Sequence, residues 1–203
     1  WSPDLLQTLL SIRSLVPVIP DVLIDVGAHR GDFAAAADRV LGFKHIVCVE
    51  PDLDLIDELQ ANLPNGKSRV HAVALSEHDG NALPHVHADR SMNSIIEADA
   101  NILREQFPTY RHDTVFERCV TTRTLDSIVG DSDECAGKSL FLKLDTQGNE
   151  LNILRGGENA LRNTVACLVE FMFCTPYATD YNFRDVIELF FENDFECRGA
   201  LSV

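Results

Sequence analysis

Two acidic residues and two glycines near the start of the chain stand at the spacing of a nucleotide-binding site. The apolar run DVLIDV contains Asp25 and leads into a turn with Gly27 and Gly31. Glu50 ends the next apolar run, about 20 positions after the second glycine, where a carboxylate can accept both hydroxyls of a ribose. The GxxxG pattern is neither the GxGxxG of dinucleotide sites nor a phosphate-cradling GxxxxGK[ST] loop. We therefore expect a nucleoside whose body passes close to the glycine turn.

The acids at these positions suit one nucleoside cofactor in particular. S-adenosylmethionine carries a cationic sulfonium and an ammonium group, so carboxylates such as Asp25 and Glu50 are electrostatically favourable around it. Glu50 has an alternative interpretation, because an acid at this point also stabilises the N-terminus of the helix that is expected to start near Pro51.

A second motif, LFLKLDTQGNELNILRGG (residues 140–157), repeats the order of apolar strand, terminal acid, glycine and helix. In a doubly wound sheet its strand would lie beside the first one, and Asp145 would face the reactive end of a cofactor. Asp145 could orient a substrate or help to remove a hydroxyl proton, or it could cap the following helix. Glu150 suits either a helix N-terminus or a site. Glu170, at the end of the next apolar run, could also reach the crevice, whereas Lys143 could form only a salt bridge.

Apolar runs alternate with helical patterns along the chain. Strands are expected at DVLIDV, HIVCVE, SRVHAVAL, SLFLKLD and VACLVEF, with a last strand beginning at Phe195. Helices are expected at GDFAAAADRVLG, PDLDLIDELQANL, NELNILRGG and FRDVIELFFEND. This alternation indicates an α/β fold, a doubly wound and mostly parallel sheet with helices on both faces.

The chain of 203 residues, 45% of them hydrophobic, fits a single domain over residues 1–203. Residues 1–20 form an N-terminal helical segment that lacks the features of a signal peptide. Residues 77–122 break the rhythm with a turn-rich stretch, as expected of an insertion that covers the substrate side, and there Asn93 and Ser94 are candidate substrate contacts. No metal site is predicted, because no recognisable ligand spacing links the histidines and acids of the insertion: His85, His87, Asp89, His112 and Asp113.

Composition narrows the possible partners. The formal net charge of −15 argues against a nucleic acid, whose phosphates require Lys and Arg. No apolar run approaches the roughly 20 residues needed to cross a membrane. The six cysteines form no CxxC pair, which favours a reducing, cytoplasmic location. The remaining partner is a small-molecule or saccharide substrate, and the sequence does not indicate an oligomeric state.

Five segments together resemble the FkbM-type family of S-adenosylmethionine-dependent methyltransferases. They are LIDVGAHRGDF, VCVEPDLDLIDELQANL, VHAVALSEHDGNALPHV, RTLDSIV and LKLDTQGNELNILRGG. Each block alone is a general methyltransferase signal, and the ordered set is more specific. The resemblance covers roughly residues 22–161 and implies a class I methyltransferase (Rossmann-like) fold.

The resemblance also implies roles for individual residues. The residues that would line the methionine part of the cofactor are Asp25, Gly27, Ala28, His29, Gly31 and Phe33. Those that would contact the ribose or adenine are Glu50, Pro51, Ala74, Leu75 and Ser76. Asp145 would lie by the transferred methyl group, with Glu150 and Glu170 as further catalytic candidates. Two departures from the family pattern, Gln147 and Asn149 where Glu and Ala are common, weaken the case for a catalytic base in this loop.

The function that these implications favour is methyl transfer from S-adenosylmethionine to a hydroxyl of a saccharide or a small natural product. A non-catalytic module that binds an adenosyl cofactor is one alternative. An NAD-dependent oxidoreductase is another, since Glu50 would suit that ribose too, although the chain lacks GxGxxG and a Tyr-x-x-x-Lys pair.

Overall fold

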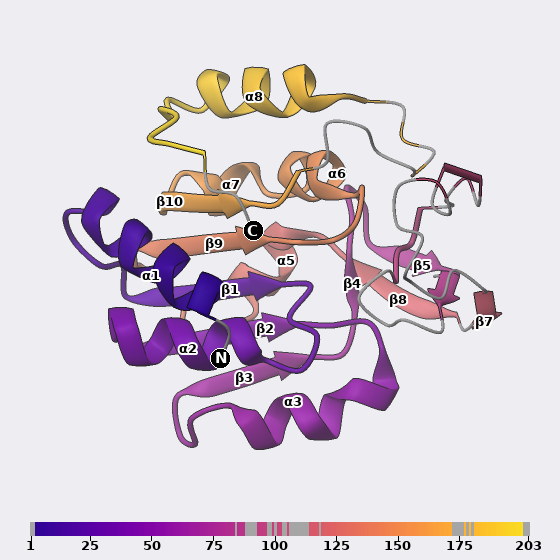
Figure 1. Cartoon of the computed structure of the whole chain (residues 1–203), viewed down its shortest axis with the longest axis horizontal. Helices are drawn as coiled ribbons and strands as arrows, with labels where there is room; N and C mark the ends of the chain where they lie inside the picture. Colours follow the sequence, from indigo (N-terminus) through magenta and orange to yellow (C-terminus); the bar gives the residue numbers. More distant parts are fainter. Residues whose placement is uncertain are drawn as a thin grey trace.

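A parallel sheet of five strands forms the centre of the computed structural model (Figure 1). The structure describes residues 3–83, 85–87, 93–96, 99, 101–102, 105, 114–117, 119–171, 177, 179 and 181–200. The order of the strands is β10-β9-β1-β2-β3, and every neighbouring pair is parallel. The strands are β1 (Val22–Val26), β2 (His45–Val49), β3 (Ser68–His71), β9 (Leu140–Leu144) and β10 (Thr164–Val169). The predicted doubly wound sheet, with the second motif beside the first, is confirmed.

Helices cover both faces of this sheet, and each face has its own core. One core joins the sheet to α1 (Pro3–Leu15), α2 (Asp32–Leu41) and α3 (Ile56–Asn62). The other joins it to α5 (Leu125–Gly130), α6 (Glu150–Arg155), α7 (Glu158–Leu161) and α8 (Phe183–Glu192). Because both faces are covered, all five residues of β1 and of β9 are buried, which explains their nearly continuous apolar sequences.

Two small sheets lie beyond the carboxyl ends of the central strands (Figure 1). The first has the order β4-β8-β5, made of β4 (Ala74–Leu75), β8 (Val120–Arg123) and β5 (Gly80–Ala82). The second pairs β6 (His85–His87) with β7 (Thr114–Glu117). The predicted insertion therefore contributes β5 to β8 at the end of the sheet where ligands bind in open α/β folds.

Two predictions about strands are wrong in detail. SRVHAVAL is not one strand, because β3 ends at His71 and β4 leaves the central sheet to pair with β8. The strand expected from Phe195 is absent from residues 195–200. There the chain turns after α8, the Phe195 N–H donates to the Phe190 carbonyl, and the two rings pack edge to face.

Candidate functional site

The carboxyl ends of four neighbouring strands meet around a switch point between β1 and β9. From β1 the chain continues to β2 and β3 on one side of the sheet, whereas β9 leads to β10 on the other. Along this edge the first residues after the strands come in the order Glu170, Asp145, Gly27 and Glu50. In open parallel sheets this crevice is the place where ligands bind.

The turn after β1 is held between the tips of its two neighbouring strands. The N–H groups of Gly27 and Ala28 donate to the Val49 carbonyl at 3.0 and 3.2 Å, and the Asp145 N–H donates to the Val26 carbonyl at 3.1 Å. Gly27 has a φ of +75°, and a Cβ at this position would lie 1.8 Å from the Asp145 carbonyl oxygen. Only glycine fits here, because both the left-handed backbone and the close approach exclude a side chain.

The second glycine of the motif is also closely packed. A Cβ on Gly31 would lie 2.8 Å from Leu59 Cδ1, and Gly31 also has a left-handed φ of +83°. Contacts within the chain therefore require both glycines, Gly27 because it lies against the end of β9 and Gly31 because it lies against α3. The GxxxG spacing does not by itself indicate that a nucleoside passes close to the turn.

Asp25 lies beneath the turn and faces the strand β9, in which Lys143 is its register partner. The Asp25 carboxylate is fully buried, and its Oδ1 lies 3.1 Å from Lys143 Nζ. Lys143 also donates to the Gly27 carbonyl at 3.2 Å, and its Nζ lies 5.4 Å from the centre of the Phe33 ring. The predicted salt bridge of Lys143 is confirmed. The carboxylate of Asp25 is fully buried and faces Lys143, and its contact with a cofactor stays a prediction.

The same lysine reaches a second carboxylate. Lys143 Nζ lies 3.2 Å from Asp145 Oδ2, so it bridges the buried Asp25 and the partly exposed Asp145. Burial raises the pKa of Asp25, and Lys143 offsets only part of this effect. Burial also opposes the charge of Lys143, but Asp25 and Asp145 outweigh it and hold the lysine pKa above its usual range. Lys143 is therefore a permanent cation beneath the crevice.

Glu50 is held between the turn after β1 and the turn after β2. Its Oε2 accepts the His29 N–H at 2.8 Å and its Oε1 accepts the Asp52 N–H at 2.9 Å. Burial raises the pKa of Glu50 to about 7, although these two N–H groups act in the opposite direction. A carboxylate oxygen has room for a second hydrogen bond, so Glu50 keeps acceptor capacity for two further donors.

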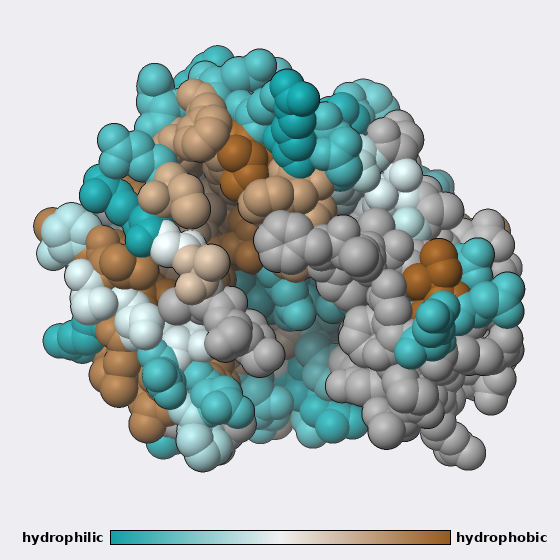
Figure 2. Space-filling view, turned by 45° about the horizontal axis from the view of Figure 1, so that its top comes forward, coloured by the Kyte–Doolittle hydropathy of each residue, from teal (hydrophilic) through white to brown (hydrophobic). Residues whose placement is uncertain are grey.

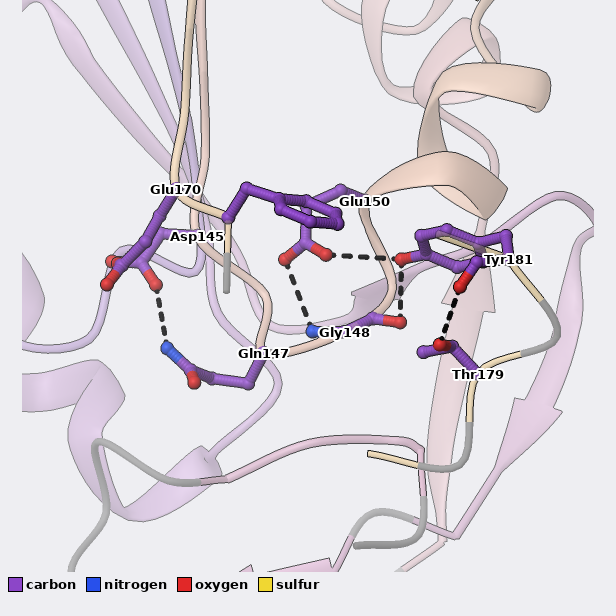
Figure 3. Close-up of a pocket in the computed structure, with 8 residues that line it drawn as sticks. Asp145, Gln147, Gly148, Glu150, Glu170, Thr179 and Tyr181 are labelled. Atoms are coloured by element: carbon purple, nitrogen blue, oxygen red, sulfur yellow. Dashed lines mark hydrogen bonds between the residues drawn. The ribbon is translucent and has the colours of Figure 1, made fainter. Parts of the chain in front are cut away.

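An open pocket of about 330 Å³ lies on the other side of Asp145, toward β10 (Figure 3). Its lining residues are Asp145, Gln147, Gly148, Glu150, Glu170, Phe171, Thr179 and Tyr181. The carboxyl groups of Asp145 and Glu170 lie side by side in this pocket, close enough to affect each other's pKa (Figure 3).

The loop between β9 and α6 forms the floor of this pocket, and Glu150 holds it in place. Glu150 Oε1 accepts hydrogen bonds from the N–H and the hydroxyl of Thr146, both at 3.0 Å, and from the Gly148 N–H at 3.3 Å. The Tyr181 hydroxyl donates to the Gly148 carbonyl at 2.7 Å and lies 3.2 Å from Glu150 Oε2. These contacts position the loop, and Glu150 is buried. A catalytic role for Glu150 stays a prediction.

Comparison with known proteins decides the family. A family model described as the methyltransferase FkbM domain matches residues 25–197. The chain belongs to this family. The resemblance inferred from the sequence is thereby confirmed, and the fold is the Rossmann-like class I type.

Two further comparisons, with curated proteins and with solved structures, do not extend the FkbM assignment. The curated proteins contain no match to the chain. A crystal structure from Pyrococcus horikoshii, of a protein named as a candidate RNA methyltransferase, matches at 33% identity with a TM-score of 0.27. That alignment covers 33% of this chain and 32% of the other, so it spans about a third of each.

In this FkbM domain, Asn93 and Ser94 cross the crevice. Asn93 Nδ2 donates to Asp52 Oδ2 at 3.0 Å, on the β2 side. The buried Ser94 hydroxyl donates to the Gln147 carbonyl at 2.7 Å, on the β9 side. Both side chains thus bind the protein itself and tie the insertion to the two sides of the switch point. Their contact with a substrate stays a prediction.

The remaining predicted cofactor residues lie around the same edge. His29, in the turn after β1, has a left-handed φ of +50°, and Pro51 follows Glu50 directly. Ala74 and Leu75 are buried in β4, and the Leu75 carbonyl accepts a hydrogen bond from Asn149 Nδ2 at 2.7 Å. The Ser76 N–H donates to the Arg123 carbonyl, so residues 74–76 also join the small sheet to α6. Their contact with adenine stays a prediction.

Several residues that shape the site were not predicted from the sequence. Gln147 has a left-handed φ of +55°, donates to Asp145 Oδ1 at 3.0 Å and accepts from the Tyr177 hydroxyl at 3.3 Å. The two tyrosines, Tyr177 and Tyr181, come from the segment before α8, which carries no motif. The sequence did contain a signal for the contact of Lys143 with Asp25. Each of these two residues interrupts an apolar run, and the two runs were expected to form neighbouring strands.

One face of the molecule contains a depression whose floor is hydrophilic (Figure 2). Among the described residues, no group of three or more His, Cys, Asp or Glu side chains has a metal-binding arrangement. His112, Asp89 and Asp113 lie outside the described residues, as do the side chains of His85 and His87. In the described part of the chain, no helix has the length and apolar character that a membrane crossing requires.

Proposed function

We propose that this FkbM domain transfers a methyl group from S-adenosylmethionine to a hydroxyl oxygen of a small molecule or a saccharide. The observation that carries this proposal is the separation of two acidic positions by one glycine turn. Glu50 lies on the β2 side of the turn, and Asp145 with its pocket lies on the β9 side. One side suits the nucleoside of the donor and the other suits the acceptor.

The residues present fit the donor. Each oxygen of Glu50 accepts one backbone N–H, which leaves the carboxylate able to accept the two hydroxyls of a ribose. Acids at this edge favour a cationic donor over an anionic one. The net charge of −15 supports an acceptor that is not a polyanion.

The sulfonium of the bound donor supplies the leaving group, and the protein aligns the reactants. Holding an acceptor hydroxyl in line with the methyl carbon and the sulfur can lower the barrier by about 7–11 kcal/mol. Asp145 supports this alignment because Lys143 and Gln147 fix its two carboxylate oxygens. The pocket around Asp145 restricts where the acceptor can lie.

Calorimetric titration of the full chain with S-adenosylhomocysteine and with NAD tests the donor. We expect S-adenosylhomocysteine to bind, and Glu50→Ala to weaken its binding at least about tenfold, because two hydrogen bonds to a carboxylate are lost. Asp57→Asn removes a nearby exposed charge in α3 and is the matched control, expected to bind like the wild type. Binding of NAD alone would contradict the proposal.

Transfer itself is tested with methyl-labelled S-adenosylmethionine and a pool of methyl glycosides and simple phenols. Label that appears in an ether would support an O-methyltransferase. Tight binding of S-adenosylhomocysteine without any labelled product from the pool or from cell extracts would favour a module that only binds the cofactor.

A further inference from the structure

The two carboxyl groups in the pocket have different surroundings. Both oxygens of Asp145 are held by donors from the protein, since Oδ2 lies 3.2 Å from Lys143 Nζ and Oδ1 accepts Gln147 Nε2 at 3.0 Å. Glu170 directly follows β10, and its carboxyl group lies in the pocket next to Asp145, where it is partly shielded from solvent. Figure 3 shows the two groups side by side, with Gln147 on the far side of Asp145.

This asymmetry decides which of the two has the higher pKa. Burial raises the pKa of Glu170, and the hydrogen bond and negative charge of Asp145 raise it further. For Asp145, burial acts in the same direction, but Lys143 and the hydrogen bonds outweigh it and lower the pKa. The charged groups that face Glu170 are Lys143 from β9, Asp145 directly after β9, and Glu150 from α6. Two neighbouring carboxyl groups whose pKa values are pushed apart are the usual pattern of an acid–base pair.

We propose that Glu170 accepts the proton of the acceptor hydroxyl, and that Asp145 is the ionised partner that orients this hydroxyl. The proposal rests on the proposed methyl transfer. In the step, a bond forms between the acceptor oxygen and the methyl carbon while the bond from methyl carbon to sulfur breaks. The bonding electron pair goes to sulfur, the hydroxyl proton goes to the Glu170 carboxylate, and solvent takes it up afterwards.

Glu170 suits this role better than Asp145 for two physical reasons. A general base is most effective when its pKa lies near the working pH, and the shifts move Glu170 toward that range and Asp145 away from it. Glu170 also lines the pocket, and within the described part of the chain the ion pairs of Lys143 are with Asp25 and Asp145, so a proton on Asp145 would break an ion pair whereas a proton on Glu170 would not. The negative charge of the ionised Asp145 would then keep the pKa of Glu170 high.

Carboxyl ¹³C NMR titration of the full chain, with and without S-adenosylhomocysteine, tests the pair directly and needs no acceptor. We expect the Glu170 carboxyl to titrate above its usual range and Asp145 to stay ionised in the same interval. Asp145→Asn should lower the Glu170 midpoint by at least about one pH unit, because a like charge is removed. Glu192→Gln, at an exposed position in α8, is the control that should leave both signals unchanged.

A second readout uses the rate of methyl transfer to an acceptor from the glycoside pool. Glu170→Gln should lower kcat by about 10²–10⁴-fold with little change in S-adenosylhomocysteine binding. Asp145→Asn should shift the acidic limb of the kcat profile to lower pH. An ordinary midpoint for Glu170, or a midpoint of Asp145 above it, would overturn the proposal. Failure to bind S-adenosylhomocysteine would instead refute the donor assignment, so the two failures are distinguishable.

Discussion

Removing Lys143 should destabilise the fold more than a surface substitution can, because Asp25 depends on it. Asp25 is fully buried and lies 3.1 Å from Lys143 Nζ. At an effective dielectric constant of about 20, this distance corresponds to an attraction of about 5 kcal/mol before desolvation is subtracted. In Lys143→Met the lysine no longer has to be desolvated, but Asp25 is left as an unpaired buried charge. We expect a net loss of about 3–5 kcal/mol at pH 7.

The double substitution Asp25→Asn with Lys143→Met separates charge pairing from packing. It removes both buried charges and keeps similar side-chain volumes, so it should recover most of the stability lost in Lys143→Met. The matched control is Lys44→Met, whose partner Asp21 is near the surface, and it should change the free energy of unfolding by at most about 1 kcal/mol.

Denaturation in guanidinium chloride at several pH values measures these differences. In Lys143→Met the loss should shrink as the pH falls, because the Asp25 pKa rises further without its cation and protonation removes the buried charge. At pH 7 the melting temperature should fall by about 2–4 °C for each kcal/mol. A single variant as stable as the wild type, or a double variant as unstable as the single one, would refute the pairing argument.

Three further outcomes are expected. Gly27→Ala should lower the free energy of unfolding, measured by chemical denaturation, by about 1–3 kcal/mol more than Gly42→Ala does. Both glycines have a left-handed φ, but of the two only Gly27 lies where a Cβ would collide with the Asp145 carbonyl. Tyr181→Phe should lower the free energy of unfolding by about 1–3 kcal/mol, because it removes the hydroxyl that holds the pocket loop. A variant as stable as the wild type would mean that the loop is held without this hydroxyl. The free energy of unfolding of the wild type, relative to that of Glu50→Gln, should fall as the pH rises from 4.5 through about 7, because burial raises the pKa of Glu50 in the folded state. A difference between the two proteins that does not change with pH would contradict this.

The central sheet could be predicted from the sequence because its strands are buried on both faces. Runs such as those of β1 and β9 have few interpretations other than a covered parallel strand, and the helices between them have clear periodicity. The region after β3 could not be predicted in the same way. β4 has two residues, and it leaves the central sheet because it pairs with β8, which lies more than 40 positions later in the chain. Such non-local pairing leaves no local pattern.

The candidate site was predicted in position but not in its connections. Glu50, Asp145 and Glu170 follow strand ends, so the alternation of strands and helices was enough to bring them to one edge. The contacts of the glycines and of Asp25 could not be predicted, because their partners, Asp145, Leu59 and Lys143, come from other segments. The tyrosine contacts of the pocket loop depend on the placement of the segment before α8, which sequence periodicity does not specify.

The two sides of the switch point differ in how their acids are charged, and this bears on how a donor would bind. Asp145 is already ionised through Lys143, whereas the pKa of Glu50 is raised to about 7 by burial. Hydrogen bonds from ribose hydroxyls favour the charged form of a carboxylate, so binding should lower the Glu50 pKa and release part of a proton near pH 7. Calorimetry of S-adenosylhomocysteine binding in buffers of different ionisation enthalpy would measure this release. It should disappear in Glu50→Gln, and an equal release in that variant would assign the proton to another group.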